Sequence, residues 1–258
     1  MEIYQPAEDS FLLQKYVKSY ALGRVLDIGT GSGILALEAA SCKLVKEVVA
    51  VDINPEAVAG LEKEIKSKNL KKLKVQFSDL FSDVKDKFDL IIFNPPYLPQ
   101  DRINGRVIED KALYGGKKGW ELSETFFQQV GKYLVAKGKI LFLFSSFTNK
   151  EKIESVIKEN LLEFKELERK RLAGFEHLYV YLVEKSKVLN ELERMNIEDI
   201  SYYTHGCRGD VFVGFLDKGK NVKSHFAPKN RLKAAIKVKR KESKANSRME
   251  IEANWLKK

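Results

Sequence analysis

Strand-like and helix-like segments alternate along the first 185 residues, and this alternation restricts the fold more than any other feature. Short apolar segments, which predict strands, lie at residues 24–29, 47–53, 72–79, 87–94 and 139–146. Longer segments with helical periodicity lie between or after them, at residues 34–43, 56–68, 119–135 and 150–159. Such an alternation builds a mostly parallel sheet covered by helices. The sequence therefore predicts an α/β fold with a doubly wound, Rossmann-like sheet.

The end of this region and the rest of the chain differ in pattern and charge. Two strand-like runs joined near Ala173-Gly174 predict an antiparallel hairpin at the sheet edge. Residues 1–185 hold 29 Lys and Arg against 27 Asp and Glu, whereas residues 186–258 hold 17 against 9. We therefore predict a domain in residues 1–185 and a small, basic α+β segment in residues 186–258, which could contact RNA or the ribosome.

The chain shows no sign of a membrane segment or a metal site. The apolar run Phe11–Val17 is too short to span a bilayer or to act as a secretory signal. Cys42 and Cys207 lie far apart and match no metal-ligand spacing, which suits a reducing compartment. We expect a cytoplasmic protein that has no contact with a membrane and no bound metal.

A glycine-rich loop, DIGTGSG at residues 27–33, follows the first strand and opens the next helix. Gly29, Gly31 and Gly33 allow a tight turn and a close approach of the backbone to a ligand. The spacing departs from the G-x-G-x-x-G of dinucleotide sites, and Asp27 at the mouth of the loop would repel a pyrophosphate. The pattern favours a ligand that carries a cationic group, such as an ammonium group.

Two further acidic residues end the next strands. Asp52 ends the second strand, where a carboxylate binds the ribose hydroxyls in doubly wound folds. Asp79 ends the third strand, where it could accept from an adenine amino group while Leu80 packs on the ring. Each aspartate alone could be a strand-end cap, but with Asp27 they meet in one crevice. The ligand that combines adenosine with a cationic group is S-adenosylmethionine (SAM), which we expect as the cofactor.

The fourth strand ends in Asn94-Pro95-Pro96-Tyr97, although an amide and two prolines suit a buried strand poorly. Its end should lie beside that of the first strand, so Asn94 should face both the cofactor and the transferred methyl group. The Asn94 side-chain oxygen and the Pro95 carbonyl could each accept one N–H of an acceptor NH2 group. Pro95 and Pro96 fix the backbone φ angles, and Tyr97 offers a flat face for a planar group. We expect these four residues to be catalytic through positioning alone.

Residues 1–185 resemble a class I methyltransferase with the N-P-P-Y motif, specifically the HemK-type protein-glutamine methyltransferases. YQPAEDSFLL (residues 4–13) is similar to the N-terminus of the archaeal and eukaryotic branch, in which Pro-x-Glu-Asp-Thr precedes a helix. Ser10 replaces that threonine, whose hydroxyl contacts the cofactor in the family. YGGKKGWE (residues 114–121) resembles the family's Gly-Gly-x-x-Gly stretch.

The resemblance implies a SAM-dependent methyltransferase domain in residues 1–185. The implied reaction is methylation of the amide nitrogen, N5, of the glutamine in the Gly-Gly-Gln loop of a translation release factor. In the archaeal and eukaryotic branch it also implies a small zinc-binding activator subunit, docked on an apolar sheet edge.

Three alternatives remain open at this point. Adenine methyltransferases use similar tetrapeptides, so N6-adenine methylation of RNA or DNA is a second reading; the nearly neutral first domain argues against it. Lysine methylation is a third, although a flat pocket suits an amide better than an ammonium group. A non-catalytic binding module is the fourth class, and the intact set of Asp27, Asp52, Asp79 and Asn94 argues against it.

The C-terminal segment resembles the start of a protein kinase N-lobe, most of all that of RIO-like archaeal kinases. A turn with Gly206 and Gly209 precedes a strand, and a later strand carries Lys237 as in the V-A-I-K motif. The resemblance implies that Glu250 or Glu252 lies on the next helix and pairs with Lys237. The catalytic H-R-D and D-F-G motifs are not found, so we expect an incomplete N-lobe without kinase activity.

Overall fold

The computed structural model describes residues 5–99, 102–103, 106–107, 115–194, 197–206, 209–216, 234–241 and 248–255. The chain divides into two compact units: residues 1–158 with 162–185, and residues 159–161 with 186–258. The roles predicted for residues 1–185 and for the basic segment 186–258 stay predictions.

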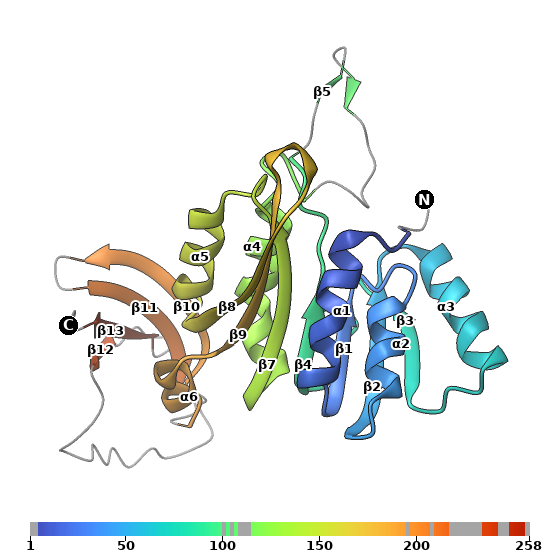
Figure 1. Cartoon of the computed structure of the whole chain (residues 1–258). Coiled ribbons are helices and arrows are strands. Elements are labelled where there is room, and N and C mark those ends of the chain that lie inside the picture. Colours follow the sequence, from blue (N-terminus) through green and yellow to red (C-terminus); the bar gives the residue numbers. More distant parts are fainter. Residues whose placement is uncertain are drawn as a thin grey trace. The chain divides into compact units, whose positions relative to one another are not determined.

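A seven-stranded sheet runs through the first unit, in the order β3-β2-β1-β4-β7-β9-β8 (Figure 1). Its strands are β1 (Gly23–Ile28), β2 (Val45–Asp52), β3 (Leu73–Phe77), β4 (Phe88–Phe93), β7 (Leu134–Ser145), β8 (Leu162–Arg171) and β9 (His177–Lys185). The strands from β3 to β7 are parallel, whereas β9 runs antiparallel to both β7 and β8. The prediction of a mostly parallel sheet with an antiparallel edge hairpin is confirmed.

Helices precede β1 and lie between most of the later strands of the sheet. They are α1 (Glu8–Tyr20), α2 (Ile34–Ser41), α3 (Pro55–Ser67), α4 (Glu121–Val130) and α5 (Lys150–Glu159), with short 3-10 turns at Gly131–Tyr133 and Ala173–Phe175. Pro55 takes the first position of α3, and the Asn54 side chain accepts the Glu56 N–H at 3.0 Å, which caps the helix. A two-residue ladder joins β5 (Arg102–Ile103) and β6 (Arg106–Val107).

Two helix boundaries differ from the sequence-based expectation. Helix α1 begins at Glu8, so Asp9 and Ser10 lie in its first turn rather than before it. The helix expected to run to residue 135 ends at Val130, because Leu134 already pairs with Phe88 in the sheet.

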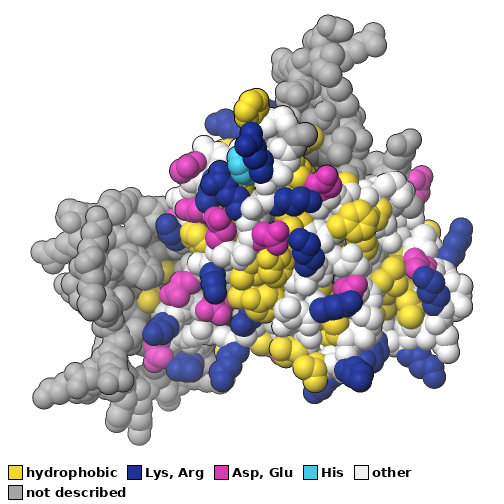
Figure 2. All heavy atoms as spheres, in the orientation of Figure 1, with side chains coloured by type: hydrophobic (Ala, Val, Ile, Leu, Met, Phe, Trp, Pro, Cys, Tyr) yellow, Lys and Arg dark blue, Asp and Glu magenta, His cyan; other side chains and the backbone are white. Residues whose placement is uncertain are grey.

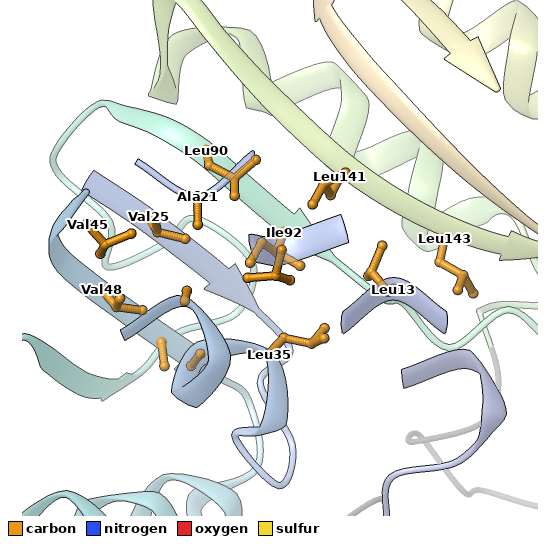
Figure 3. Packing of buried hydrophobic residues seen from close by; sticks show 14 of the residues in the cluster. Leu13, Ala21, Val25, Leu35, Val45, Val48, Leu90, Ile92, Leu141 and Leu143 are labelled. Carbon is orange, nitrogen blue, oxygen red and sulfur yellow. The ribbon is translucent and has the colours of Figure 1, made fainter. Parts of the chain in front are cut away.

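Alternate residues of the central strands pack on opposite faces of the sheet, as strand geometry requires. Ile92, Leu141 and Leu143 belong to a buried aliphatic cluster together with α1 and α2 residues such as Leu13 and Leu35 (Figure 3). Their chain neighbours belong to an aromatic cluster with α4 instead. Its closest contact joins Phe93 and Phe126, whose ring centroids lie 4.3 Å apart, and further members are Phe81, Phe127, Phe142 and Phe144. Helices therefore cover both faces, so the sheet is doubly wound.

The second unit contains α6 (Lys187–Arg194) and an antiparallel sheet in the order β10-β11-β13-β12. Its strands are β10 (Ile197–Gly206), β11 (Gly209–Leu216), β12 (Ala234–Lys241) and β13 (Arg248–Trp255). The expectation that Glu250 or Glu252 lies on a helix is wrong, since both lie on β13 and Glu252 is in register with Lys237. The physical reason is the period-two alternation of RMEIEANW, which is typical of a strand.

Charges are mixed on the face of the first unit that Figure 2 shows. In Figure 2, Lys and Arg side chains are interspersed with Asp and Glu on the face that is shown. Among the described residues, no helix is long and apolar enough to cross a membrane, and no cluster of three metal-ligating side chains occurs.

Candidate active site

A cavity of about 280 Å³ opens where the parallel strands end. It lies beside β1, between β2 and β4, where the order of the sheet reverses and doubly wound folds bind their ligands. The lining comes from the first turn of α1, the β1–α2 loop, the ends of β2 and β4, the loop after β3 and the β8–β9 hairpin. The predicted site residues on this lining are Ser10, Gly29, Gly31, Asp52, Asp79, Leu80, Asn94, Pro95, Pro96 and Tyr97.

The glycines of the β1–α2 loop serve two purposes. Gly29 lines the cavity with a φ of +64°, and a Cβ added there would meet no atom within 4 Å. Gly31 also lines the cavity, with a φ of +53°. Gly33 lies outside the lining and caps α2, where a Cβ would approach the Leu61 side chain to 2.6 Å. Gly29 therefore leaves room for a ligand against the backbone, and Gly33 allows close packing on α3.

Asp27 is buried beneath the loop rather than exposed at its mouth, because β1 continues for one more residue between β2 and β4. It is not part of the cavity lining. Its Oδ2 accepts the Thr30 hydroxyl at 2.7 Å, and its buried Oδ1 has no partner among the described residues. Burial raises the pKa of the Asp27 carboxyl to about 7; the Thr30 hydrogen bond lowers it, and the nearby Asp52 charge raises it. Its interaction with a cationic ligand group stays a prediction.

The Asp52 carboxylate connects the β1–α2 loop to the end of β2. Its two oxygens accept the N–H groups of Gly31 and Asn54, each at 2.8 Å. Asp79 is exposed after β3, and Leu80 beside it has a φ of +48°, which is unusual outside glycine. The exposed Ile53 also lines the cavity at this end, and the sequence reasoning did not select it.

Asn94 lies at the opposite end of the cavity and forms a hydrogen bond across to α1. Its Nδ2 donates to Asp9 Oδ2 at 3.0 Å. Its Oδ1 is buried and has no partner among the described residues. Asp9 is 4% exposed, and the sequence analysis passed over it in favour of its neighbour Ser10. Asp9 could have been found from the sequence, because both Asp9 and Ser10 belong to the P-A-E-D-S motif.

The Asn94–Tyr97 segment is held by close backbone packing. The Thr148 hydroxyl donates to the Tyr97 carbonyl at 3.0 Å, and the Gly115 N–H donates to the Leu98 carbonyl at 3.0 Å. A Cβ at Gly119 would come within 2.6 Å of the Tyr97 carbonyl oxygen. The backbone of the Gly-Gly-x-x-Gly stretch therefore packs directly against the backbone of this segment, because only glycine permits so close an approach.

Glu176 of the β8–β9 hairpin also lines the cavity, near its Asn94 end, and was not predicted. Its Oε1 accepts the hydroxyl of the fully buried Ser145 at 2.6 Å. No local motif marks this residue, since it reaches the cavity only because β9 pairs with β7.

The sheet order, with a cavity at the carboxyl ends of its parallel strands, defines a Rossmann-like fold. The model of the family "Methyltransferase small domain" matches residues 8–175. The chain therefore belongs to the methyltransferase small domain family, within its HemK-type group.

Individual relatives agree with this membership. A protein of Methanocaldococcus jannaschii, assigned as a protein N5-glutamine methyltransferase, is 39% identical over 185 residues, which cover 69% of this chain and 90% of the relative. Human methyltransferase HEMK2 is 31% identical over 176 residues, which cover 63% and 80%. Among solved structures, the E. cuniculi Mtq2-Trm112 complex, described as responsible for methylation of the eRF1 translation termination factor, contains a chain with a TM-score of 0.57. That chain is 24% identical, and the match covers 72% of this chain and 100% of that chain, which shows the shared fold.

The kinase resemblance of the C-terminal segment finds no support. The family match ends at residue 175, and the helix required for Glu250 or Glu252 is a strand. The interpretation of residues 186–258 as an incomplete kinase N-lobe therefore stays a prediction without support.

Proposed function

We propose that this protein transfers a methyl group from SAM to the amide nitrogen, N5, of the glutamine in the Gly-Gly-Gln loop of a translation release factor. The observation that carries the proposal is the buried, unpartnered Oδ1 of Asn94 on the cavity wall, an acceptor suited to an N–H of a planar amide. The names of the M. jannaschii and bacterial relatives support the same substrate.

The cavity fits SAM on its own geometry. The open space above Gly29 is a cradle that a side chain would fill, so a ligand can lie against the backbone there. Asp52 would hold the ribose hydroxyls, and Asp79 with Leu80 would hold the adenine. When bound, SAM supplies a methyl group activated by a cationic sulfur.

The chain's own contribution is to orient the acceptor nitrogen. Asn94 Oδ1 accepts one N–H, the Pro95 carbonyl accepts the other, and Tyr97 packs against the planar amide, with Pro96 stiffening the segment between them. As the nitrogen forms one N–C bond through its lone pair, the bond between the SAM sulfur and that methyl carbon would break. S-adenosylhomocysteine would then leave, and the nitrogen would lose one proton to solvent. Positioning and fixed acceptors supply the catalysis, so a side-chain acid or base is not needed.

A nucleic-acid substrate is disfavoured by charge. The first 185 residues are nearly neutral, and acidic and basic side chains are interspersed on the surface in Figure 2. Binding to a phosphate backbone draws on clustered Lys and Arg. A lysine substrate would present an ammonium group, which lacks the free lone pair and the flat shape that this cavity end suits.

We extend the proposal to a small activator subunit. The structurally similar Mtq2 chain is described in a complex with Trm112. Strand β3 is one of the two outer strands of the sheet, and the apolar side chain of Phe77 at its end is 52% exposed. We place such a partner at this edge. The same proposal includes zinc binding by the activator and a contact of the basic C-terminal segment with RNA or the ribosome. It also includes a cytoplasmic location.

Methyl transfer from labelled SAM to the cognate release factor tests the function. It is measured with and without added activator. We expect label on the wild-type release factor and none on a variant whose Gly-Gly-Gln glutamine is replaced by alanine. Equal labelling of both release factors would contradict the assigned acceptor. Labelling of RNA or DNA instead, with loss of binding at high salt, would replace the proposal by the adenine alternative.

Asp52→Ala should abolish most of the stabilisation by SAM. A ligand at 100 times its Kd stabilises by about 2.7 kcal/mol, or roughly 5–10 °C in Tm for a domain of this size. We expect that shift for the wild type and for Asp83→Ala, which removes an exposed carboxylate outside the cavity lining. We expect a shift below about 2 °C for Asp52→Ala, measured against that variant's own Tm. A full shift in Asp52→Ala would exclude Asp52 from cofactor binding.

A further inference from the structure

We propose that Asp9 is a positioning residue for methyl transfer, which fixes the orientation of the Asn94 side-chain amide. The inference rests on the proposed function, in which Asn94 Oδ1 accepts an N–H of the substrate amide. It adds a residue to the reaction that neither contacts the acceptor nitrogen nor belongs to the N-P-P-Y segment.

The Asp9–Asn94 hydrogen bond joins two parts of the chain that are 85 residues apart. Asn94 Nδ2 lies 3.0 Å from Asp9 Oδ2, and both residues line the same cavity. The second oxygen of Asp9 accepts the Ser10 N–H at 2.6 Å and its hydroxyl at 3.3 Å. Both carboxylate oxygens are therefore held, so the group presented to Asn94 has a fixed place.

The chemistry of a carboxylate determines which way the Asn94 amide faces. A carboxylate only accepts hydrogen bonds, so Asn94 must turn its NH2 group toward Asp9. The amide rotated by 180° would set two oxygens against each other and would offer an N–H to the substrate amide. That orientation could not accept the substrate's N–H. Asp9 thus selects the orientation in which Asn94 Oδ1 is offered to the acceptor.

Helix α1 gives Asp9 a rigid support. Leu12 and Leu13 follow in the next turn and are 1% and 0% exposed in the core. Figure 3 shows Leu13 among the buried side chains near Leu143. Asp9 also lies in the first turn of α1, where the helix dipole favours a negative side chain. The carboxylate is thereby anchored to the sheet that carries Asn94.

Steady-state kinetics at saturating SAM, with the release factor as substrate, test this role. We expect Asp9→Ala to lower kcat by roughly 10- to 100-fold, the range of a hydrogen bond to a charged group. Asp9→Asn should lower kcat by roughly 3- to 10-fold, since its amide can still present an oxygen to Asn94. SAM affinity should stay within about threefold in both variants, because the effect lies at the acceptor end of the cavity. Glu8→Gln, which removes a neighbouring exposed charge that pairs with Lys170, should retain the wild-type kcat.

A second readout follows the Asn94 amide without any reaction. In 15N-labelled protein, the Asn94 side-chain NH2 signal is identified by its absence in Asn94→Ala. We expect slow exchange of these protons with solvent in the wild type and in Glu8→Gln, and fast exchange in Asp9→Ala. A residue that only stabilised the fold would leave this signal unchanged.

The possible failures can be told apart. A kcat within twofold of wild type in Asp9→Ala, or an unchanged Asn94 signal, would overturn the inference. If Asp9→Ala does not fold, a wild-type kcat in Asp9→Asn overturns it as well. Full activity in Asn94→Ala would instead overturn the catalytic role of Asn94, and with it the proposal on which this inference depends.

Discussion

Asn94→Ala is expected to lower kcat for methyl transfer by about 10²- to 10³-fold, the usual cost of removing one fixed hydrogen-bonding group at a reacting centre. The buried Asn94 Oδ1 has no partner among the described residues, so its capacity to accept a hydrogen bond is unused. The alanine variant loses this acceptor and leaves the substrate NH2 free to rotate. Because Asp52 and the glycine loop remain, SAM should still stabilise the variant against heat.

Asn149→Ala is the matched control for this experiment. The Asn149 side chain accepts the Lys152 N–H at 2.9 Å at the start of α5 and is not part of the cavity lining. Its removal should cost about 1 kcal/mol of stability, as for other helix caps, with an unchanged kcat. An Asn94→Ala variant with more than a tenth of wild-type kcat would show that Asn94 is not a catalytic group.

Much of the fold followed from the sequence because each strand of the sheet is marked locally. The apolar runs that became β1, β2 and β4 are buried on both faces, and a run of that kind is typical of a parallel sheet. The β8–β9 hairpin was marked by its turn at Gly174, which has a φ of +71°. Strand β13 was misassigned because the resemblance to a kinase was given more weight than the alternating pattern of its own residues.

The cavity was predictable only in part, for a physical reason. Residues at strand ends, such as Asp52 and Asn94, converge whenever the strands are parallel, so their positions could be inferred. Glu176 reaches the cavity through tertiary packing of the edge hairpin, which no local pattern encodes. Asp9 reaches it through packing of α1, and its only sequence signal is the P-A-E-D-S stretch that it shares with Ser10. Asp27 was expected at the mouth of the loop, whereas it is buried beneath the loop and is not part of the cavity lining.

Gly119→Ala is expected to lower kcat by about 100-fold, although Gly119 lies outside the cavity lining. Its φ is +83°, and a Cβ there would lie 2.6 Å from the Tyr97 carbonyl oxygen and 3.0 Å from the Pro99 nitrogen. Both neighbours are backbone atoms, so the clash can be relieved only by moving the Asn94–Tyr97 segment or the glycine stretch itself. Displacement of reacting groups by about 1 Å is enough for a loss of this size.

Gly23→Ala separates displacement of the segment from simple loss of stability. Gly23 also has a positive φ, +59°, and a Cβ there would also be crowded, but by the Asp89 side chain at the opposite end of β1. Each variant should lose about 1–2 kcal/mol or more of stability, because alanine is strained at these φ values. Only Gly119→Ala should lose kcat when both are assayed well below their Tm. Equal kcat values in the two variants would mean that the glycine stretch supports the fold and does not set the position of Asn94.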